Sequence, residues 1–217
     1  MTANSPVEVT SGGKERVDRA ADILAAAFEE DPIYRYFFHD VAEAKRREGR
    51  RKVIGGFVKA SALNDAEVIE VADWGSCGVL VPPGKKAENP LTLIQAGLIQ
   101  MIRMVFDYTG TAEELKNKAL SKEESKAYWY VLLMGTAAER RNQGLASKVL
   151  AYMQEKARSE GRPLWLEASN QDSRRLFAKN GFKDAGEIVL GKGIVDSDGI
   201  PREDGEGVTA WGMVWRP

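Results

Sequence analysis

The chain has 217 residues, a length that suits one large domain or two small ones and buries a hydrophobic core without disulfide staples. Its 31 basic and 32 acidic residues give a formal net charge of −1, so composition offers no electrostatic case for a nucleic-acid or membrane partner. A single Cys excludes an internal disulfide, and one Cys with one His argues against a zinc site. Residues 1–6 lack the apolar core of a signal peptide and no stretch approaches a membrane span, so we expect a cytoplasmic protein.

Strand and helix patterns alternate in the first half of the chain. Apolar alternation predicts strands, the last two as a hairpin, at residues 6–10, 67–72 and 76–81, with a turn at 11–13. Apolar residues at spacings of three and four predict helices at 17–29, 33–39, 41–63 and 91–105, followed by a charged helix at 111–126. The aromatic residues of 33–39 either cap the core or form one wall of an acceptor pocket. Residues 89–125 are longer than a usual connection, so we expect acceptor specificity or oligomer contacts there.

The second half is organised around one strand, one tight polar turn and one helix. Residues 128–136 are apolar and aromatic, which predicts the strand. Apolar residues at helical spacing predict a helix that begins at Leu145 and is stopped by residues 161–163. The patterns that follow predict, in order, a strand at 164–169, a helix at 171–180 with a left-handed cap at Gly181, a strand at 182–190, a hairpin loop at 195–207 and a strand at 208–215 that closes the sheet.

The turn before Leu145 predicts an anion site. A helix that begins there has backbone N–H groups without intrahelical partners, and these donors with the helix dipole favour a phosphate. Gly144 and Ala146 are small enough for close approach, and Arg140 and Arg141 add positive charge. The sequence therefore predicts a diphosphate cradle at a strand–helix junction. It contains neither the Walker loop nor the G-x-G-x-x-G fingerprint.

Residues 141–146 fit the pattern R/Q-x-x-G-x-G/A, which resembles the acyl-CoA loop of the GCN5-related N-acetyltransferases (GNAT). The strand before this loop, the helix after it and the runs at 164–170 and 176–182 follow the order of that family, so the resemblance covers residues 128–190. The arrangement looks most like puromycin N-acetyltransferase and its relatives. A looser likeness at 26–32 extends toward the start of the chain.

The resemblance implies an α/β (α+β) fold, a single GNAT domain spanning 1–217 with an atypical helical insertion at about 89–125. Its central sheet is expected to be mixed and mostly antiparallel, with helices on both faces. Asn170 and the polar turn after it indicate that the strand ending there and the strand ending at Thr136 splay apart. An extended amide chain can dock in such a gap as an added strand.

The resemblance also implies acetyl-CoA as co-substrate, with no metal. The backbone of Met134, Gly135 and Thr136 would hold the pantetheine arm and polarise the thioester carbonyl, and the side chain of Asn170 would touch the arm. The diphosphate would be held by Arg141, Asn142, Gln143, Gly144, Leu145, Ala146 and Ser147. Phe177 belongs to the same cofactor-binding set. It stands where the family commonly has a Tyr that protonates the leaving thiolate, so that proton would come from water or from a hydroxyl of Tyr128, Tyr130 or Ser169, unless the thiolate leaves without help.

An attacking amine must lose a proton, and two residues are candidates for accepting it. Glu167 follows an apolar run, where partial burial raises the pKa of a carboxyl group. The alternative for Glu167 is a structural hydrogen bond to backbone or Arg. Tyr130 precedes an expected bulge in its strand, and the alternative for Tyr130 is a core aromatic with a satisfied hydroxyl.

The function that these observations favour is acetyl transfer to the amine of a small molecule by direct attack in a ternary complex. A non-catalytic acyl-CoA-binding sensor or scaffold of the same fold is the first alternative, because Phe177 cannot donate a proton. A domain with no ligand at all is the second. We expect a small-molecule amine as partner, no nucleic acid, no membrane, and a monomer or homodimer.

Overall fold

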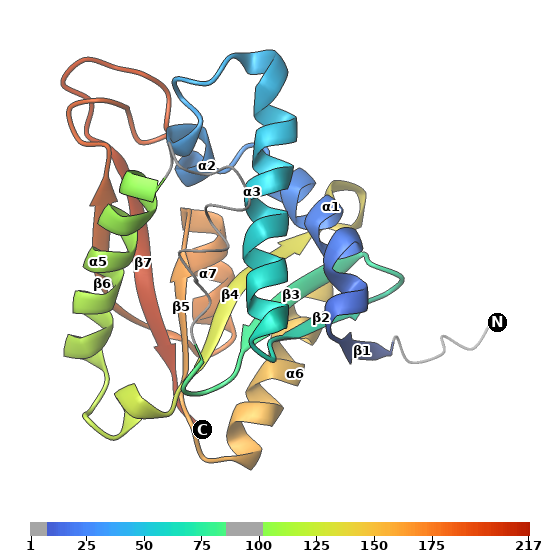
Figure 1. The fold of residues 1–217 in the computed structure, drawn as a ribbon. Coiled ribbons are helices and arrows are strands. Elements are labelled where there is room, and N and C mark those ends of the chain that lie inside the picture. Colours follow the sequence, from blue (N-terminus) through green and yellow to red (C-terminus); the bar gives the residue numbers. More distant parts are fainter. Residues whose placement is uncertain (1–7, 86–101) are drawn as a thin grey trace.

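The protein is built on one seven-stranded sheet (Figure 1). The computed structural model describes residues 8–85 and 102–217, with the backbone alone for 102–107. The strands, in sheet order, are β1 (Val9–Gly12), β2 (Glu67–Val71), β3 (Ser76–Val81), β4 (Trp129–Thr136), β5 (Leu164–Ala168), β7 (Val208–Trp215) and β6 (Lys183–Leu190). Neighbouring strands are antiparallel except β4 and β5, which are parallel. The expected mixed, mostly antiparallel sheet is therefore confirmed.

Helices cover both faces of the sheet, as expected (Figure 1). One face carries α1 (Val17–Ala27), α2 (Pro32–Phe37), α3 (Glu43–Leu63) and α5 (Ile102–Ala119). The other face carries α6 (Leu145–Ser159) and α7 (Gln171–Lys179). Short 3₁₀ turns occupy Lys14–Arg16, Glu124–Lys126 and Ala138–Arg140. Each helical layer buries its apolar stripe on the sheet, so the strands between them are buried on both sides, and all six residues of β3 are buried.

The parallel pair β4–β5 splays almost at once. Its pairing consists of Trp129 with Leu164 and Tyr130 with Trp165, after which the two strands part. On the other side of β4, Leu80 pairs with Val131 and Val79 with Leu133, so one residue of β4 is extra. This bulge confirms the expected irregularity just after Tyr130, and bulges are known to redirect strands near active sites. The splay leaves the β5-facing backbone of β4 without a strand partner among the described residues.

Several element predictions need correction. Ser11 and Gly12, predicted as a turn, pair with β2 in strand β1, and the chain turns only at Gly13. The predicted helix at 111–126 ends at Ala119, and a separate 3₁₀ turn follows at Glu124–Lys126. Residues 6–7 of the first predicted strand and 91–101 of the predicted helix at 91–105 lie outside the described residues.

The last strand does not close the sheet. β7 inserts between β5 and β6, and β6 is the edge strand. Seven of the eight residues of β7 are buried, whereas β6 is mostly exposed or half-buried. A strand that is apolar on both faces is stable in the sheet interior, and a more polar strand tolerates the edge. The predicted alternation of Trp211, Met213 and Trp215 on one face is confirmed.

Candidate active site

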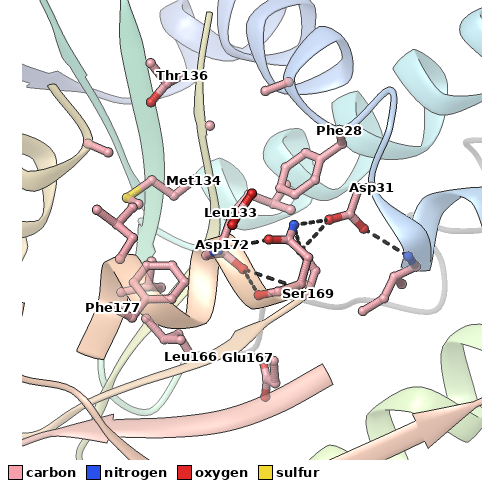
Figure 2. Close-up of a pocket in the computed structure, with 18 of the residues that line it drawn as sticks. Phe28, Asp31, Leu133, Met134, Thr136, Leu166, Glu167, Ser169, Asp172 and Phe177 are labelled. Atoms are coloured by element: carbon pink, nitrogen blue, oxygen red, sulfur yellow. Dashed lines mark hydrogen bonds between the residues drawn. The ribbon is translucent and has the colours of Figure 1, made fainter. Parts of the chain in front are cut away.

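A cavity of about 1210 Å³ opens at the point where β4 and β5 part (Figure 2). Its walls come from β4 and β5, from the junction before α6, from α7, and from α1, α2, α3 and α5. Residues more than a hundred positions apart in the chain therefore face one space. The cavity is large enough for a cofactor arm and a small second molecule, since ordinary ligand pockets measure about 300–1,000 Å³.

One end of the cavity is the predicted cradle. Gly144 is the N-cap of α6 in the left-handed conformation (φ 73°), and Asn142 also has positive φ (61°). No side chain caps this helix, and the N–H groups of residues 142–147 have no acceptor in the described part of the chain. A Cβ at Gly144 would meet nothing within 4 Å, so this glycine is required by its backbone conformation rather than by crowding. The predicted free amide donors are confirmed for the described part of the chain, and all of these residues except Gln143 line the cavity.

The side chains of the cradle differ in where they point. Arg141 lines the cavity and places Nη2 3.5 Å from the carbonyl oxygen of Ala27. The Gln143 side chain is turned to the local backbone, because its amide donates to the carbonyl of Glu139 and accepts from Arg140. Of the predicted diphosphate set, Gln143 is absent from the cavity wall and could contribute only its backbone. The wall includes the other members, Arg141, Asn142, Gly144, Leu145, Ala146 and Ser147.

The three predicted pantetheine residues, Met134, Gly135 and Thr136, also line the cavity. Gly135 is packed closely by α1, since a Cβ there would lie 2.7 Å from the Cβ of Ala27. Its carbonyl accepts a hydrogen bond from Ser76 on β3, while the opposite edge of β4 faces the gap. This segment can therefore offer backbone donors and acceptors to an extended amide chain.

Asn170 and Phe177 both line the cavity. Asn170 is the N-cap of α7: its Oδ1 accepts from Ser173 N at 2.9 Å, and Ser173 Oγ accepts from Asn170 N in return. Its Nδ2 donates to Asp31 at 3.0 Å. Both ends of the amide are thus engaged within the protein. Phe177 is 6% exposed and packs against Phe182 with ring centroids 5.7 Å apart.

Glu167 and Tyr130, the two predicted catalytic residues, form a hydrogen-bonded pair on the cavity wall. Tyr130 Oη donates to Glu167 Oε2 at 2.7 Å, and Trp165 Nε1 donates to Oε1 at 2.6 Å. Burial raises the pKa of Glu167, and these two hydrogen bonds oppose the rise. Glu167 therefore has the structural hydrogen bonds of one interpretation, although neither partner is backbone or Arg. It also lines the cavity, as the other interpretation, a catalytic base, requires. The Tyr130 hydroxyl donates its hydrogen bond to the Glu167 carboxylate, a group that can itself accept a proton.

The aromatic segment predicted either to cap the core or to wall a pocket does both. Tyr34 and Phe37 are buried in the core cluster and also line the cavity, whereas Tyr36 does not line it. His39 lies outside the cavity wall, where it stacks on Tyr36 and its Nδ1 lies 2.7 Å from the Tyr36 carbonyl.

Known acetyltransferases match this chain in sequence and in fold. Residues 99–182 match the family model described as "Acetyltransferase (GNAT) family". Solved structures share the fold over nearly the whole chain: arylalkylamine N-acetyltransferase 2 from Aedes aegypti (TM-score 0.63, 13% identity, 98% of this chain and 99% of that one) and a histone acetyltransferase HPA2-related acetyltransferase from Corynebacterium glutamicum (0.61, 16%, 97% and 96%). A polyamine N-acetyltransferase from Drosophila melanogaster also matches (0.59, 13%, 97% and 100%).

An uncharacterized N-acetyltransferase of Schizosaccharomyces pombe is 23% identical over 194 residues, which cover 85% of this chain and 76% of that protein. These matches support a GNAT superfamily acetyltransferase. Within the described ranges of this acetyltransferase, no cluster of three or more His, Cys, Asp or Glu side chains could hold a metal ion. None of its described helices is both long and apolar enough to cross a membrane.

The sequence did not single out Asp31 as a site residue of the acetyltransferase. Asp31 is 5% exposed, lines the cavity and caps α2 by accepting from the backbone N–H of Ile33 (3.0 Å) and Tyr34 (3.4 Å). Its other oxygen accepts from Ser169 Oγ and from Asn170, so it ties α2 to the end of β5 (Figure 2). Burial raises its pKa, and the hydrogen bonds oppose that rise. The Asp-Pro pair is a helix-start signal that could have placed Asp31 at a helix N-terminus, although not in the site.

Lys116 on α5 was also missed. It is 8% exposed and does not line the cavity, and its Nζ donates to Glu113 and, at 2.6 Å, to Tyr128 Oη. Burial works against its charge, but these hydrogen bonds outweigh burial and raise the pKa of Lys116. The resulting ammonium lowers the pKa of Glu167, against the larger effect of burial. The sequence around Lys116 has the charged pattern of an ordinary surface helix, so it does not indicate that this lysine is buried.

Proposed function

We propose that this protein transfers an acetyl group from acetyl-CoA to the primary amine of a small molecule, by direct attack within a ternary complex. The observation that carries the proposal is the shared cavity: residues 142 and 144–147 of the cradle, the unpaired edge of β4 and Glu167 all line it. The reaction requires that the diphosphate and the amide arm of the co-substrate be bound next to a proton acceptor of the protein.

The cradle fits acetyl-CoA as co-substrate. The backbone N–H groups of 142–147 and the Arg141 guanidinium would bind the diphosphate, and the pantetheine arm would extend along Met134 to Thr136. The thioester carbonyl would then point at backbone N–H donors of β4. Donors fixed in this way stabilise the negative charge that develops on the carbonyl oxygen during attack. Asn170 keeps its Asp31 and Ser173 bonds, so we assign it to shaping the arm's wall rather than to a new hydrogen bond.

The incoming amine passes its proton to Glu167, directly or through the Tyr130 hydroxyl, and the neutral nitrogen forms the new bond to the acetyl carbon. Collapse of the resulting tetrahedral species breaks the carbon–sulfur bond and releases the CoA thiolate. The acetylated nitrogen loses its second proton, and the thiolate gains one to leave as the thiol. A raised pKa suits Glu167 to accept a proton near neutral pH. Of the hydroxyls considered for protonating the thiolate, Tyr130 and Ser169 line the cavity, whereas Tyr128 does not and is bound to Lys116.

The acceptor is a small molecule in this proposal. Structural neighbours include enzymes named for arylalkylamines and for a polyamine, and the aromatic segment at 33–39 contributes rings to the cavity. The order of motifs in residues 128–190 also resembles that of puromycin N-acetyltransferase, and we include such enzymes among the relatives proposed for this protein. We extend the proposal to one domain over 1–217, to a cytoplasmic location and to a monomer or homodimer that binds neither nucleic acid nor membrane.

Two measurements test the proposal. Isothermal titration with acetyl-CoA should give micromolar binding, and a thiol-release assay over a panel of primary amines should give turnover. Glu167→Gln should keep acetyl-CoA affinity while lowering kcat by roughly 100-fold or more, as expected for loss of a general base. No binding at millimolar acetyl-CoA would refute the proposal.

An acyl-CoA-binding sensor is the second candidate, and Phe177 is the observation that favours it. A sensor would bind acetyl-CoA with the same affinity and release no thiol with any amine. Turnover in the same panel therefore separates the two functions, because both predict binding.

A further inference from the structure

The two sides of the cavity carry opposite chemistry. Every described Lys or Arg side chain on its wall comes from the cradle or from α7, and these are Arg140, Arg141, Arg175 and Lys179. The first side also carries Asp172, which is paired with Arg175. The opposite side, built from α1, the loop after it, α2, α3, α5 and the sheet, contributes aromatic rings together with the acidic residues Glu30, Asp31 and Glu167. Of these three, Glu30 is already paired with Arg35. A diphosphate fits the first side, and the second remains for the acceptor.

The rings on the acceptor side form a continuous row. Phe28 lies 4.9 Å from Tyr34, Tyr34 lies 6.0 Å from Phe37, and Phe37 lies 6.4 Å from Tyr108, between ring centroids. Phe57 of α3 adds a fifth ring to the wall. Such a surface takes up apolar and aromatic groups, and ring faces also attract organic cations.

The carboxyl groups of Asp31 and Glu167 lie on the same wall, and the nearby cations are already engaged. Arg50 is buried, does not line the cavity, and binds the Ala25 carbonyl (2.7 Å) and Glu29 (3.0 Å). Lys116 likewise stays off the wall and binds Glu113 and Tyr128. Among the described residues, the basic side chain that reaches this side is that of Arg141, at the Ala27 carbonyl beside the cradle. Away from that point, this side offers acidic and aromatic groups to a ligand.

We propose that the acceptor is a cationic primary amine with an apolar or aromatic body and no carboxylate, so that free α-amino acids are rejected. This inference rests on the proposed function, since it assigns the acceptor side of the same cavity. The ammonium is attracted by the acidic groups and the ring faces before it loses its proton. An α-carboxylate would be desolvated beside like charges without a partner, which is strongly unfavourable.

The matched ligand pair is 2-phenylethylamine and L-phenylalanine, which differ by one carboxylate. Isothermal titration of each into the full-length protein, with saturating desulfo-CoA to fill the cradle without chemistry, measures acceptor binding alone. We expect 2-phenylethylamine to bind at least about 100-fold more tightly than phenylalanine. Equal affinities, or no binding of 2-phenylethylamine at 10 mM, would overturn the inference. Binding of 2-phenylethylamine without thiol release from acetyl-CoA would support it while refuting the proposed acetyl transfer.

A charge-introducing variant gives a second readout. Phe57→Arg places a guanidinium on the aromatic wall and should narrow the discrimination against phenylalanine by about tenfold, because the carboxylate gains a partner. Phe57→Leu is the matched control: it removes the ring without adding charge and should leave the discrimination within about threefold of the unmodified protein. If both variants change the ratio equally, charge does not set the selectivity and the inference fails. Should Phe57→Arg not fold, the ligand pair decides alone.

Discussion

Reversing the charge of Arg141 tests the cradle most directly. Arg141 lines the cavity beside the free N–H groups of 142–147 and is exposed, so its attraction for a bound diphosphate is partly screened. A charge pair 4 Å apart contributes about 1 kcal/mol in bulk water and about 4 kcal/mol near a protein surface. We assign about 1–1.5 kcal/mol to the attraction between the exposed guanidinium and a bound diphosphate. A carboxylate at the same position should repel the diphosphate by a similar amount. Arg141→Glu should therefore weaken acetyl-CoA binding by about 2–3 kcal/mol, or roughly 30- to 150-fold.

The matched control is Lys148→Glu, which makes the same change in net charge. Lys148 is exposed on the first turn of α6 and does not line the cavity. Isothermal titration at 0.15 M salt should show less than about a threefold loss for this variant, because its side chain lies in solvent off the cavity wall, where salt screens its charge. S-acetyl-pantetheine, which has no diphosphate, should bind both variants and the unmodified protein equally. Equal losses for Arg141→Glu and Lys148→Glu, or an equal loss for S-acetyl-pantetheine, would show that the diphosphate does not lie against Arg141.

Three further outcomes follow from the site. Phe177→Tyr restores a hydroxyl on the cavity wall and should raise the thiol-release rate by up to roughly 100-fold, with acetyl-CoA affinity unchanged; a rate at or below that of the unmodified protein would show that no general acid is missing. Lys116→Met removes the ammonium that lowers the pKa of Glu167, so the acid limb of kcat/KM and the pH midpoint of the Trp165 indole N–H resonance should both move to higher pH, while Lys116→Arg should keep them near their original values. Asp31→Asn removes a buried carboxyl whose folded pKa is raised, a group that makes folding less favourable as pH rises above its unfolded pKa of about 3.9. The melting temperature of Asp31→Asn relative to the unmodified protein should therefore be more favourable at pH 8 than at pH 4, and the opposite order would contradict the raised pKa.

The sequence alone was sufficient for the features that depend on neighbours in the chain. The cradle is one, because a glycine in the left-handed conformation at the start of a helix exposes N–H donors wherever that helix packs. The strand, turn and helix from 128 to 161 could be predicted for the same reason. The splayed strand pair was also predictable, from Asn170 and the polar turn after it and from the family resemblance.

Tertiary structure decided the features that join distant parts of the chain. Ser169 bonds to Asp31 across 138 positions, and Tyr130 bonds to Glu167 across 37. Neither contact has a local signature, because a hydrogen bond between side chains depends on strand order and on which face each residue occupies. The place of β7 inside the sheet was decided in the same way: its apolar pattern predicts a strand, but only the packing of both helical layers determines that a strand buried on two faces lies in the interior and leaves β6 at the edge.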